Sequence, residues 1–198
     1  IFLKNNHHII RINNQLHLYK DGIYVAGQQE IESAMIKHIP QLNRAKRTEV
    51  MSYLDIMIRE STASTSANMI AFRNGIYNIT TDEFFQFSPE YVITNKIDWD
   101  YNPHAYYEST DEVLNNIACK DKEIRMLLEE LIGYCMYRRN ELGKAFILTG
   151  SGSNGKSTYL NLLKTALISD TAEYDDVTPV INAEYIDNVY YIETEREL

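Results

Sequence analysis

The chain of 198 residues is 44% hydrophobic and carries a formal net charge of −9. It is long enough to bury a sizeable core, as one large domain or two small ones, and its acidity argues against a protein that coats DNA by charge alone. It has no apolar run of about eighteen residues that would span a membrane, and its N-terminus is too short and polar for a signal peptide, so we expect a cytoplasmic protein without a membrane partner.

The distribution of charge along the chain and the two cysteines limit the possible nucleic-acid and metal sites. Residues 1–60 sum to +2, residues 61–140 to −5 and residues 141–198 to −6, so any main basic surface for nucleic acid is small, local or outside this chain. Cys119 and Cys135 are expected to be reduced thiols, because no Cys/His cluster has zinc spacing. The chain lacks an initiator Met, and we expect it to be a fragment of a longer protein.

The first predicted elements are three strands and two helices. Apolar and polar residues alternate over 8–12, 15–19 and 23–26, separated by Asn13-Asn14 and Asp21-Gly22, a pattern typical of a hairpin meander. A helix is predicted from about Gln28 to Pro40 and another over about 43–60. Their apolar faces are expected to be Ile31, Ala34, Met35, His38 and Ile39 in the first helix, and Val50, Tyr53, Leu54, Met57 and Ile58 in the second.

A polar connector, a second set of strands and a long helix are predicted next. Residues 61–68 form a run of Ser, Thr and Ala that is typical of a connector. From about Thr110 to near Arg139 the pattern predicts one helix with the apolar stripe Leu127, Leu128, Leu131, Ile132 and Cys135. Strands are expected over residues 69–72, 76–79, 83–87 and 91–94.

A phosphate-binding motif follows. Residues 150–157, Gly-Ser-Gly-Ser-Asn-Gly-Lys-Ser, fit G-x-x-x-x-G-K-[ST] in full. A short apolar strand over 145–149 precedes the motif, and a helix with its packing side at Tyr159, Leu160, Leu162, Leu163, Ala166 and Leu167 is expected to follow it.

Each residue type in the motif has a physical reason. Glycines bring the backbone close to phosphate oxygens, and the N–H groups of the loop and first helical turn favour an anion. Lys156 is expected to reach the β- and γ-phosphates of ATP, Ser157 to ligate Mg²⁺, and Thr158 to donate a further hydroxyl to the α-phosphate. The predicted nucleotide-binding residues are Gly150, Ser151, Gly152, Ser153, Asn154, Gly155, Lys156, Ser157 and Thr158.

With these residues in place, the sequence resembles the phage and plasmid primase–helicase family, which is related to poxvirus helicase-primases. Its superfamily 3 Walker A form, Gly-x-Gly-x-Asn-Gly-Lys-Ser-Thr, is similar to residues 150–158. Upstream, residues 74–79, 87–94, 98–103 and 130–135 resemble, in order, the module ahead of that ATPase domain.

The resemblance implies an ATP-driven, hexameric replicative DNA helicase of a phage, plasmid or mobile element, acting in the host cytoplasm. Its fold class would be α/β. A mixed β-and-α collar or initiation module would span 1–140, with a possible sub-boundary at 61–68. The start of an AAA+-like P-loop domain, truncated here, would span 141–198.

Hydrolysis in such an enzyme needs an acidic Walker B strand. Residues 189–192 are apolar and are followed by Glu193 and Glu195, which are the predicted catalytic carboxylates beside Lys156, with Glu193 also a Mg²⁺ ligand. A surface strand running into a charged terminus explains the same residues equally well. Asp175-Asp176 is a weaker candidate, since no apolar run precedes it.

Two further features leave alternatives open. Arg44, Lys46 and Arg47 form a basic cluster that is either a solvated helix face or a DNA contact. The aromatic segment with Trp99, Tyr101, Tyr106 and Tyr107 is more typical of packing at a domain boundary than of base stacking. At the level of function, the alternatives are a kinase-type phosphotransferase and a non-hydrolysing nucleotide-binding initiator or scaffold.

Overall fold

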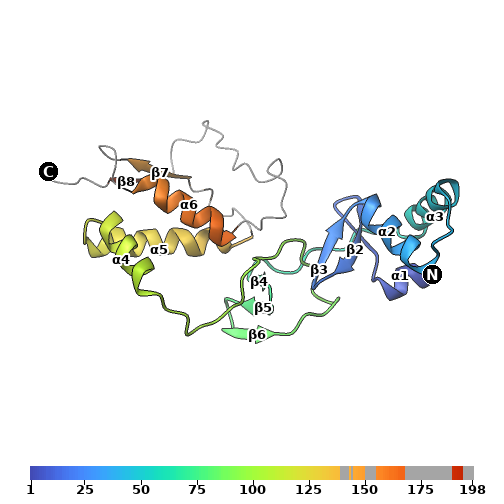
Figure 1. Ribbon diagram of the computed structural model, residues 1–198, viewed down its shortest axis with the longest axis horizontal. Helices are drawn as coiled ribbons and strands as arrows, with labels where there is room; N and C mark the ends of the chain where they lie inside the picture. Colours follow the sequence, from blue (N-terminus) through green and yellow to red (C-terminus); the bar gives the residue numbers. More distant parts are fainter. Residues whose placement is uncertain (139–142, 144, 150–154, 168–188, 194–198) are drawn as a thin grey trace. The chain divides into compact units, whose positions relative to one another are not determined.

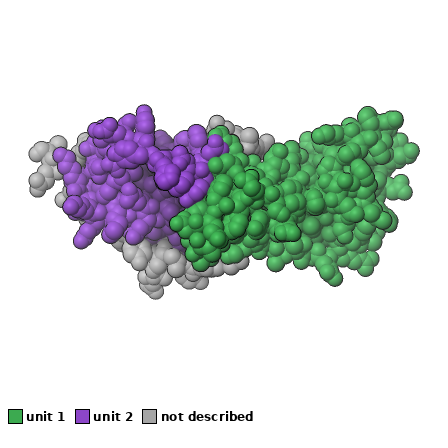
Figure 2. All heavy atoms as spheres, turned by 90° about the horizontal axis from the view of Figure 1, so that it is seen from below, with its two compact units in different colours: residues 1–96 green, residues 97–198 purple. Residues whose placement is uncertain are grey.

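The structure is a computed structural model that describes residues 1–138, 143, 145–149, 155–167 and 189–193, the last of these by backbone alone. Within these residues the fold is mixed α/β with small sheets (Figure 1). Contacts divide the chain into two compact units, residues 1–96 and 97–198 (Figure 2). The boundary predicted near residue 140 separates two functional modules, not two compact units, and it stays a prediction.

The first sheet is the predicted meander. β1 (Ile10–Ile12), β2 (Gln15–Lys20) and β3 (Ile23–Ala26) pair antiparallel in chain order. Both turns have positive φ at their two central residues, 45° and 67° at Asn13-Asn14 and 50° and 91° at Asp21-Gly22. Such turns match the right-handed twist of the strands, which is why Asn and Gly stand here.

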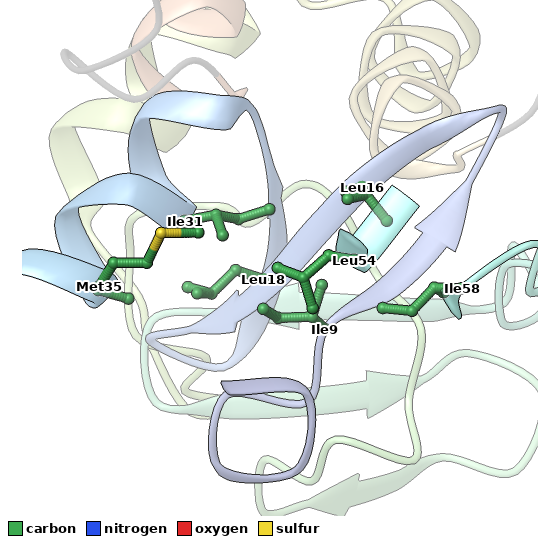
Figure 3. Packing of buried hydrophobic residues seen from close by; sticks show 8 residues of the cluster. Ile9, Leu16, Leu18, Ile31, Met35, Leu54 and Ile58 are labelled. Atoms are coloured by element: carbon green, nitrogen blue, oxygen red, sulfur yellow. The ribbon is translucent and has the colours of Figure 1, made fainter. Parts of the chain in front are cut away.

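Three helices accompany this sheet: α1 (Phe2–Asn6), α2 (Gln28–His38) and α3 (Arg44–Met57). α2 stops before Pro40, as predicted. The buried cluster that joins the sheet to the helices includes Ile9, Leu16, Leu18, Ile31, Met35, Leu54 and Ile58 (Figure 3).

The predicted apolar faces of these two helices were too wide. Tyr53 of α3 is 62% exposed, and His38 and Ile39 at the end of α2 are exposed too. Successive helical residues are rotated by about 100°, so Tyr53 points well away from the buried Leu54.

Arg11 of β1 joins the sheet to the C-terminus of α3. It is 8% exposed, and its guanidinium donates to the carbonyl oxygens of Ile58 at 2.7 Å and Asp55 at 3.0 Å. It also pairs with Asp55 Oδ1 at 2.6 Å. The last carbonyls of a helix lack partners within the helix, so Arg11 stabilises this helix end.

The predicted connector at residues 61–68 is hydrogen-bonded to two other segments of the first unit. Thr62 N donates to Arg11 O at 2.7 Å, and Thr65 N donates to Val92 O at 2.9 Å. Thr65 Oγ1 accepts from Val92 N at 2.7 Å. The segment therefore forms part of the first unit's hydrogen-bonded structure.

The second sheet contains three of the four predicted strands. β4 (Met69–Phe72), β5 (Gly75–Asn78) and β6 (Glu83–Phe85) pair antiparallel. The predicted strand at 91–94 is wrong. Its backbone makes separate hydrogen bonds, from Tyr24 N to Ile93 O at 2.8 Å and to Thr65 through Val92, so it does not form a ladder with one partner.

In the second unit, the single helix predicted over 110–139 is wrong. α4 (Glu108–Ile117) and α5 (Lys122–Met136) are separated by Cys119 and Lys120, with φ of 52° and 63°. Asp121 caps α5, since its Oδ1 accepts from the N–H groups of Glu123 at 2.8 Å and Ile124 at 3.1 Å. A capping carboxylate starts a new helix where apolar periodicity alone suggests continuity.

β7 (Ala145–Thr149), α6 (Lys156–Leu167) and β8 (Val189–Glu193) complete the described elements. β7 and β8 pair in parallel. α4, α5 and α6 share one buried cluster: Leu114, Ile117, Ala118, Leu128, Leu131, Tyr159 and Leu163. Among the described helices, none has the length and apolar character to cross a membrane.

Candidate functional site

The glycine-rich motif lies between β7 and α6. The predicted strand at 145–149 and the predicted helix from Lys156 are both confirmed. Gly155 has a φ of 87°, in the left-handed region that glycine adopts readily. The first helical bond runs from Tyr159 N to Gly155 O at 2.9 Å. The remaining predicted loop residues, Gly150, Ser151, Gly152, Ser153 and Asn154, lie outside the described residues.

The start of α6 presents Lys156, Ser157 and Thr158. The side chains of Ser157 and Thr158 are exposed, and the first turn contains no acidic residue. The first N–H groups of a helix have no partner within the helix and carry partial positive charge. This end of α6 can therefore accept a negatively charged group.

The opposite side of α6 is packed. Tyr159 is fully buried at 0% exposure and Leu163 at 9%, whereas Leu160, predicted on the packing side, is 49% exposed. Burial, with a smaller effect of Cys135, raises the pKa of Tyr159 above its usual value. The hydroxyl therefore stays protonated and donates to the carbonyl oxygen of Leu128 at 2.6 Å.

The predicted Walker B residue Glu193 ends β8. In the parallel register, Ala145 is opposite Val189 and Thr149 is opposite Glu193. The carboxyl ends of β7 and β8 therefore lie side by side, and the motif follows directly after the carboxyl end of β7. Glu195 and the weaker candidates Asp175 and Asp176 lie outside the described residues.

The basic cluster at the start of α3 is only partly available to a ligand. Arg47 donates through Nε to Glu32 Oε2 at 2.8 Å and through Nη1 to the Leu42 carbonyl at 2.7 Å. The Arg47 hydrogen bond, followed by one from Gln28, lowers the pKa of Glu32. Arg44 and Lys46 are exposed. The structure thus gives Arg47 a structural contact and leaves Arg44 and Lys46 at the surface.

The aromatic residues near position 100 also differ in whether they contact the rest of the protein. Trp99 Nε1 donates to the carbonyl oxygen of Thr165, in the last turn of α6, at 3.0 Å. Tyr106 and Tyr107 are 76% and 71% exposed. Trp99 is itself 53% exposed, so in this segment the structure shows one hydrogen bond from Trp99 to α6 and leaves Tyr106 and Tyr107 at the surface.

Sequence reasoning missed Ile117, the last residue of α4. A Cβ placed on Gly155 would lie 2.7 Å from Ile117 Cγ1, so Ile117 occupies the space beside the motif's last glycine. The signal in the sequence was weak, because Ile117 is one of many apolar residues in a helical pattern. Among the residues that the structure describes, no group of three or more His, Cys, Asp or Glu could hold a metal ion.

Comparison with known proteins identifies the family. A sequence profile of the family described as "D5 N terminal like" matches residues 3–133, which is more than half of the chain. The chain belongs to this family. Its matched region contains the whole first unit apart from the first two residues, together with α4 and most of α5.

One relative is a viral protein. A protein of Acanthamoeba polyphaga mimivirus named "Putative helicase L207/L206" is 29% identical over 102 residues. These residues are 50% of this chain and 11% of the mimivirus protein. The alignment thus covers a small part of a much longer relative.

Proposed function

We propose that this chain is part of an ATP-dependent replicative DNA helicase, and that residues 150–158 bind the phosphates of ATP. The observation that carries the proposal is the complete phosphate-binding motif between a strand and a helix, with Gly155 at positive φ and Lys156 opening α6. Backbone N–H groups, a helix N-terminus and one Lys are the groups with which such loops bind phosphate.

In this proposal each predicted site residue has a separate role in ATP binding or hydrolysis. Lys156 neutralises charge on the β- and γ-phosphates, and the hydroxyl of Thr158 donates to the α-phosphate. Glu193 orients the attacking water and accepts its proton as the bond to the γ-phosphorus forms and the β–γ bridging bond breaks. Glu195 is the neighbouring carboxylate.

The donor set fits Mg²⁺. Ser157 lies in the first turn of α6, and the register places the backbone of Glu193 opposite Thr149, the residue that ends β7. Mg²⁺ in nucleotide sites is bound by few protein oxygens, together with substrate phosphates and water. Ser157 and Glu193 would hold the ion, which would neutralise negative charge on the phosphates.

The wider function is supported by the family and by the mimivirus relative, which is named as a helicase. By this reasoning the protein acts on DNA in replication for a phage, plasmid or mobile element, as a hexameric ring in the cytoplasm of a host cell. Residues 1–140 would be the collar or initiation module, and the arginine finger would come from a neighbouring subunit.

The test is the ATPase and strand-displacement activity of the full-length protein, with and without DNA. Lys156→Ala is expected to lower ATP turnover by about a hundredfold or more, because it removes a charge that stabilises the transferred phosphate. Glu193→Gln is expected to retain ATP binding and to stall hydrolysis. Lys164→Ala, an exposed change on the same helix, is the control and should leave turnover unchanged.

The outcomes separate the alternatives. Phosphoryl transfer to an acceptor without a response to DNA would indicate a kinase-type phosphotransferase. ATP binding without turnover would indicate an initiator or scaffold. If Lys156→Ala turns over ATP like the unchanged protein, the motif has no part in the mechanism, and normal hydrolysis by Glu193→Gln would remove that residue from its role.

A further inference from the structure

α6 is held at three points along its length by residues that precede the motif in the chain. Ile117 of α4 lies beside Gly155, the carbonyl of Leu128 in α5 accepts from Tyr159, and Trp99 donates to the carbonyl of Thr165. All of these residues belong to the second unit. Trp99, Ile117 and Leu128 also lie within the family match at 3–133.

The first point fixes the turn into the helix. A Cβ on Gly155 would come within 2.7 Å of Ile117 Cγ1 and 3.4 Å of its Cδ1. Ile117 is 6% exposed and belongs to the same buried cluster as Tyr159, so it has little freedom to move aside. The path of the backbone immediately before Lys156 is therefore fitted against α4.

The second point fixes the rotation of the helix about its axis. Tyr159 is 0% exposed and its Oη lies 2.6 Å from Leu128 O. That carbonyl lies in the interior of α5, and its second lone pair can accept an additional donor. A rotation of α6 would break this bond and leave a buried hydroxyl without a partner, which is unfavourable.

The third point holds the other end of α6. Thr165 belongs to the last turn, whose carbonyls have no partner within the helix, and Trp99 Nε1 donates to it at 3.0 Å. Ser157 lies about 200° around the helix from Tyr159. Tyr159 thus holds the buried face of α6, while the motif hydroxyl of Ser157 lies on the opposite, exposed face.

We propose that Ile117 and Tyr159 are positioning residues for nucleotide binding, and that helices α4 and α5 set the placement of the motif's first helical turn. This inference rests on the proposed function, in which Lys156 and Ser157 contact the nucleotide phosphates. Neither positioning residue needs to touch the nucleotide. Each acts through the turn at Gly155 and the rotation of α6, because groups that bind phosphate must be held to within a fraction of an ångström.

The test uses the full-length protein and two small changes that keep the fold. Tyr159→Phe removes the hydroxyl and keeps the ring, and Ile117→Val removes one methyl group beside Gly155. Each is expected to raise the KM for ATP, and the Kd for a fluorescent ATP analogue, by about threefold to tenfold with kcat changed less than about twofold, because ground-state contacts are weakened. Ile117→Leu, which restores the methyl group, should recover part of the affinity.

Matched controls separate positioning from ordinary stability. Ile132→Val removes a methyl group from a residue packed against the same cluster, and Tyr107→Phe removes a hydroxyl from an exposed tyrosine of the same unit. These controls should shift Tm by as much or less than the test variants and leave KM unchanged. If the test variants lower Tm and keep the normal KM, the two residues are structural only and the inference is overturned.

The inference and the proposed function fail in different ways. If the unchanged protein does not bind the ATP analogue, or if Lys156→Ala binds it normally, the proposed function fails. If the unchanged protein binds it, Lys156→Ala does not, and Tyr159→Phe and Ile117→Val bind it normally, the inference alone fails.

Discussion

The N-termini of α3 and α6 look alike in sequence and differ in structure. Each begins with a basic residue, and neither has an acidic residue in its first turn. α3 follows Asn43, whose side chain accepts from Lys46 N at 3.0 Å. α6 follows Gly155, which has no side chain to act as a cap.

The difference shows how the use of a helix N-terminus is decided by its surroundings. At α3 the cap and the contacts of Arg47 with Glu32 and Leu42 satisfy local groups. At α6 the contacts lie on the buried side of the helix, at Tyr159, and Ser157 and Thr158 are exposed. An anion would therefore meet donors at α6 that α3 has partly used within its own structure.

The largest effect is expected where the two helix starts differ most. Gly155→Ala should lower the free energy of unfolding by about 1–3 kcal/mol, because alanine is strained at this φ, and its Cβ would meet Ile117 at 2.7 Å. ATP binding should weaken about tenfold or more, because the turn before Lys156 must shift. Chemical denaturation and binding of an ATP analogue measure the two effects.

Gly133→Ala is the control for this change. Gly133 lies in α5, and a Cβ there would meet no heavy atom within 4 Å. It should stabilise the protein by about 0.5–1 kcal/mol, since alanine is favoured over glycine in a helix. Normal stability and normal ATP binding in Gly155→Ala would contradict the proposed importance of this turn.

At α3, Arg47→Met is expected to lower the free energy of unfolding by about 1–2 kcal/mol, because the Glu32 carboxylate and the Leu42 carbonyl lose a charged donor. Urea denaturation measures it. Arg44→Met, which changes an exposed side chain, should stay within about 0.5 kcal/mol of the unchanged protein. Equal effects of the two changes would mean that the α2–α3 contact is not the role of Arg47.

A smaller effect tests whether the exposed part of the basic cluster contacts DNA. If Arg44 and Lys46 each contact one phosphate, replacing both with Ala should flatten the plot of log K against log salt by about 1.8 for duplex DNA. Filter binding or anisotropy of the full-length protein over a salt series measures the slope. An unchanged slope would leave these residues as a solvated face.

The smallest effect concerns the end of α2 that leads into α3. His7 Nε2 lies 2.8 Å from His38 Nε2. Burial first, and then the charges of His38, Lys37 and His8, lower the pKa of His7 below 6.5. The unfolded chain binds the proton more readily, so this contribution to stability is complete above about pH 6.5 and is lost as pH falls through that value toward the folded pKa.

His7→Gln should reduce the pH dependence of Tm in this window, measured by thermal denaturation between about pH 5 and pH 8. His104→Gln, at an exposed position outside this group, should leave the pH dependence unchanged. If both variants keep the full pH dependence, other groups cause it.

Local chemistry made most of the elements predictable. Asn13-Asn14 and Asp21-Gly22 define the turns of the first sheet, and Pro40 limits α2, because these residues restrict φ and hydrogen bonding at single positions. The errors arose where competing local contacts matter. Asp121 caps a new helix inside a continuous apolar pattern, and residues 91–94 find hydrogen-bond partners from two separate segments.

The candidate site also contains features that local sequence predicts and features that depend on contacts with distant segments. The motif, its strand and its helix could be read from the sequence, because the order of Gly, Lys and Ser fixes the chemistry over a few residues. The roles of Ile117, Leu128 and Trp99 could not be predicted, since each lies at least 31 residues before the residue that it meets at the motif or in α6.

The sequence by itself therefore determined the phosphate-binding motif, the meander and the end of α2 before Pro40, because these depend on backbone freedom and on donors within a few residues. The tertiary structure decided which charged and polar groups are used internally. It paired Arg47 with Glu32, left Arg44 and Lys46 exposed, and placed Ile117 against Gly155. The physical reason is that burial and hydrogen-bond satisfaction depend on neighbours distant in the chain, which residue spacing does not encode.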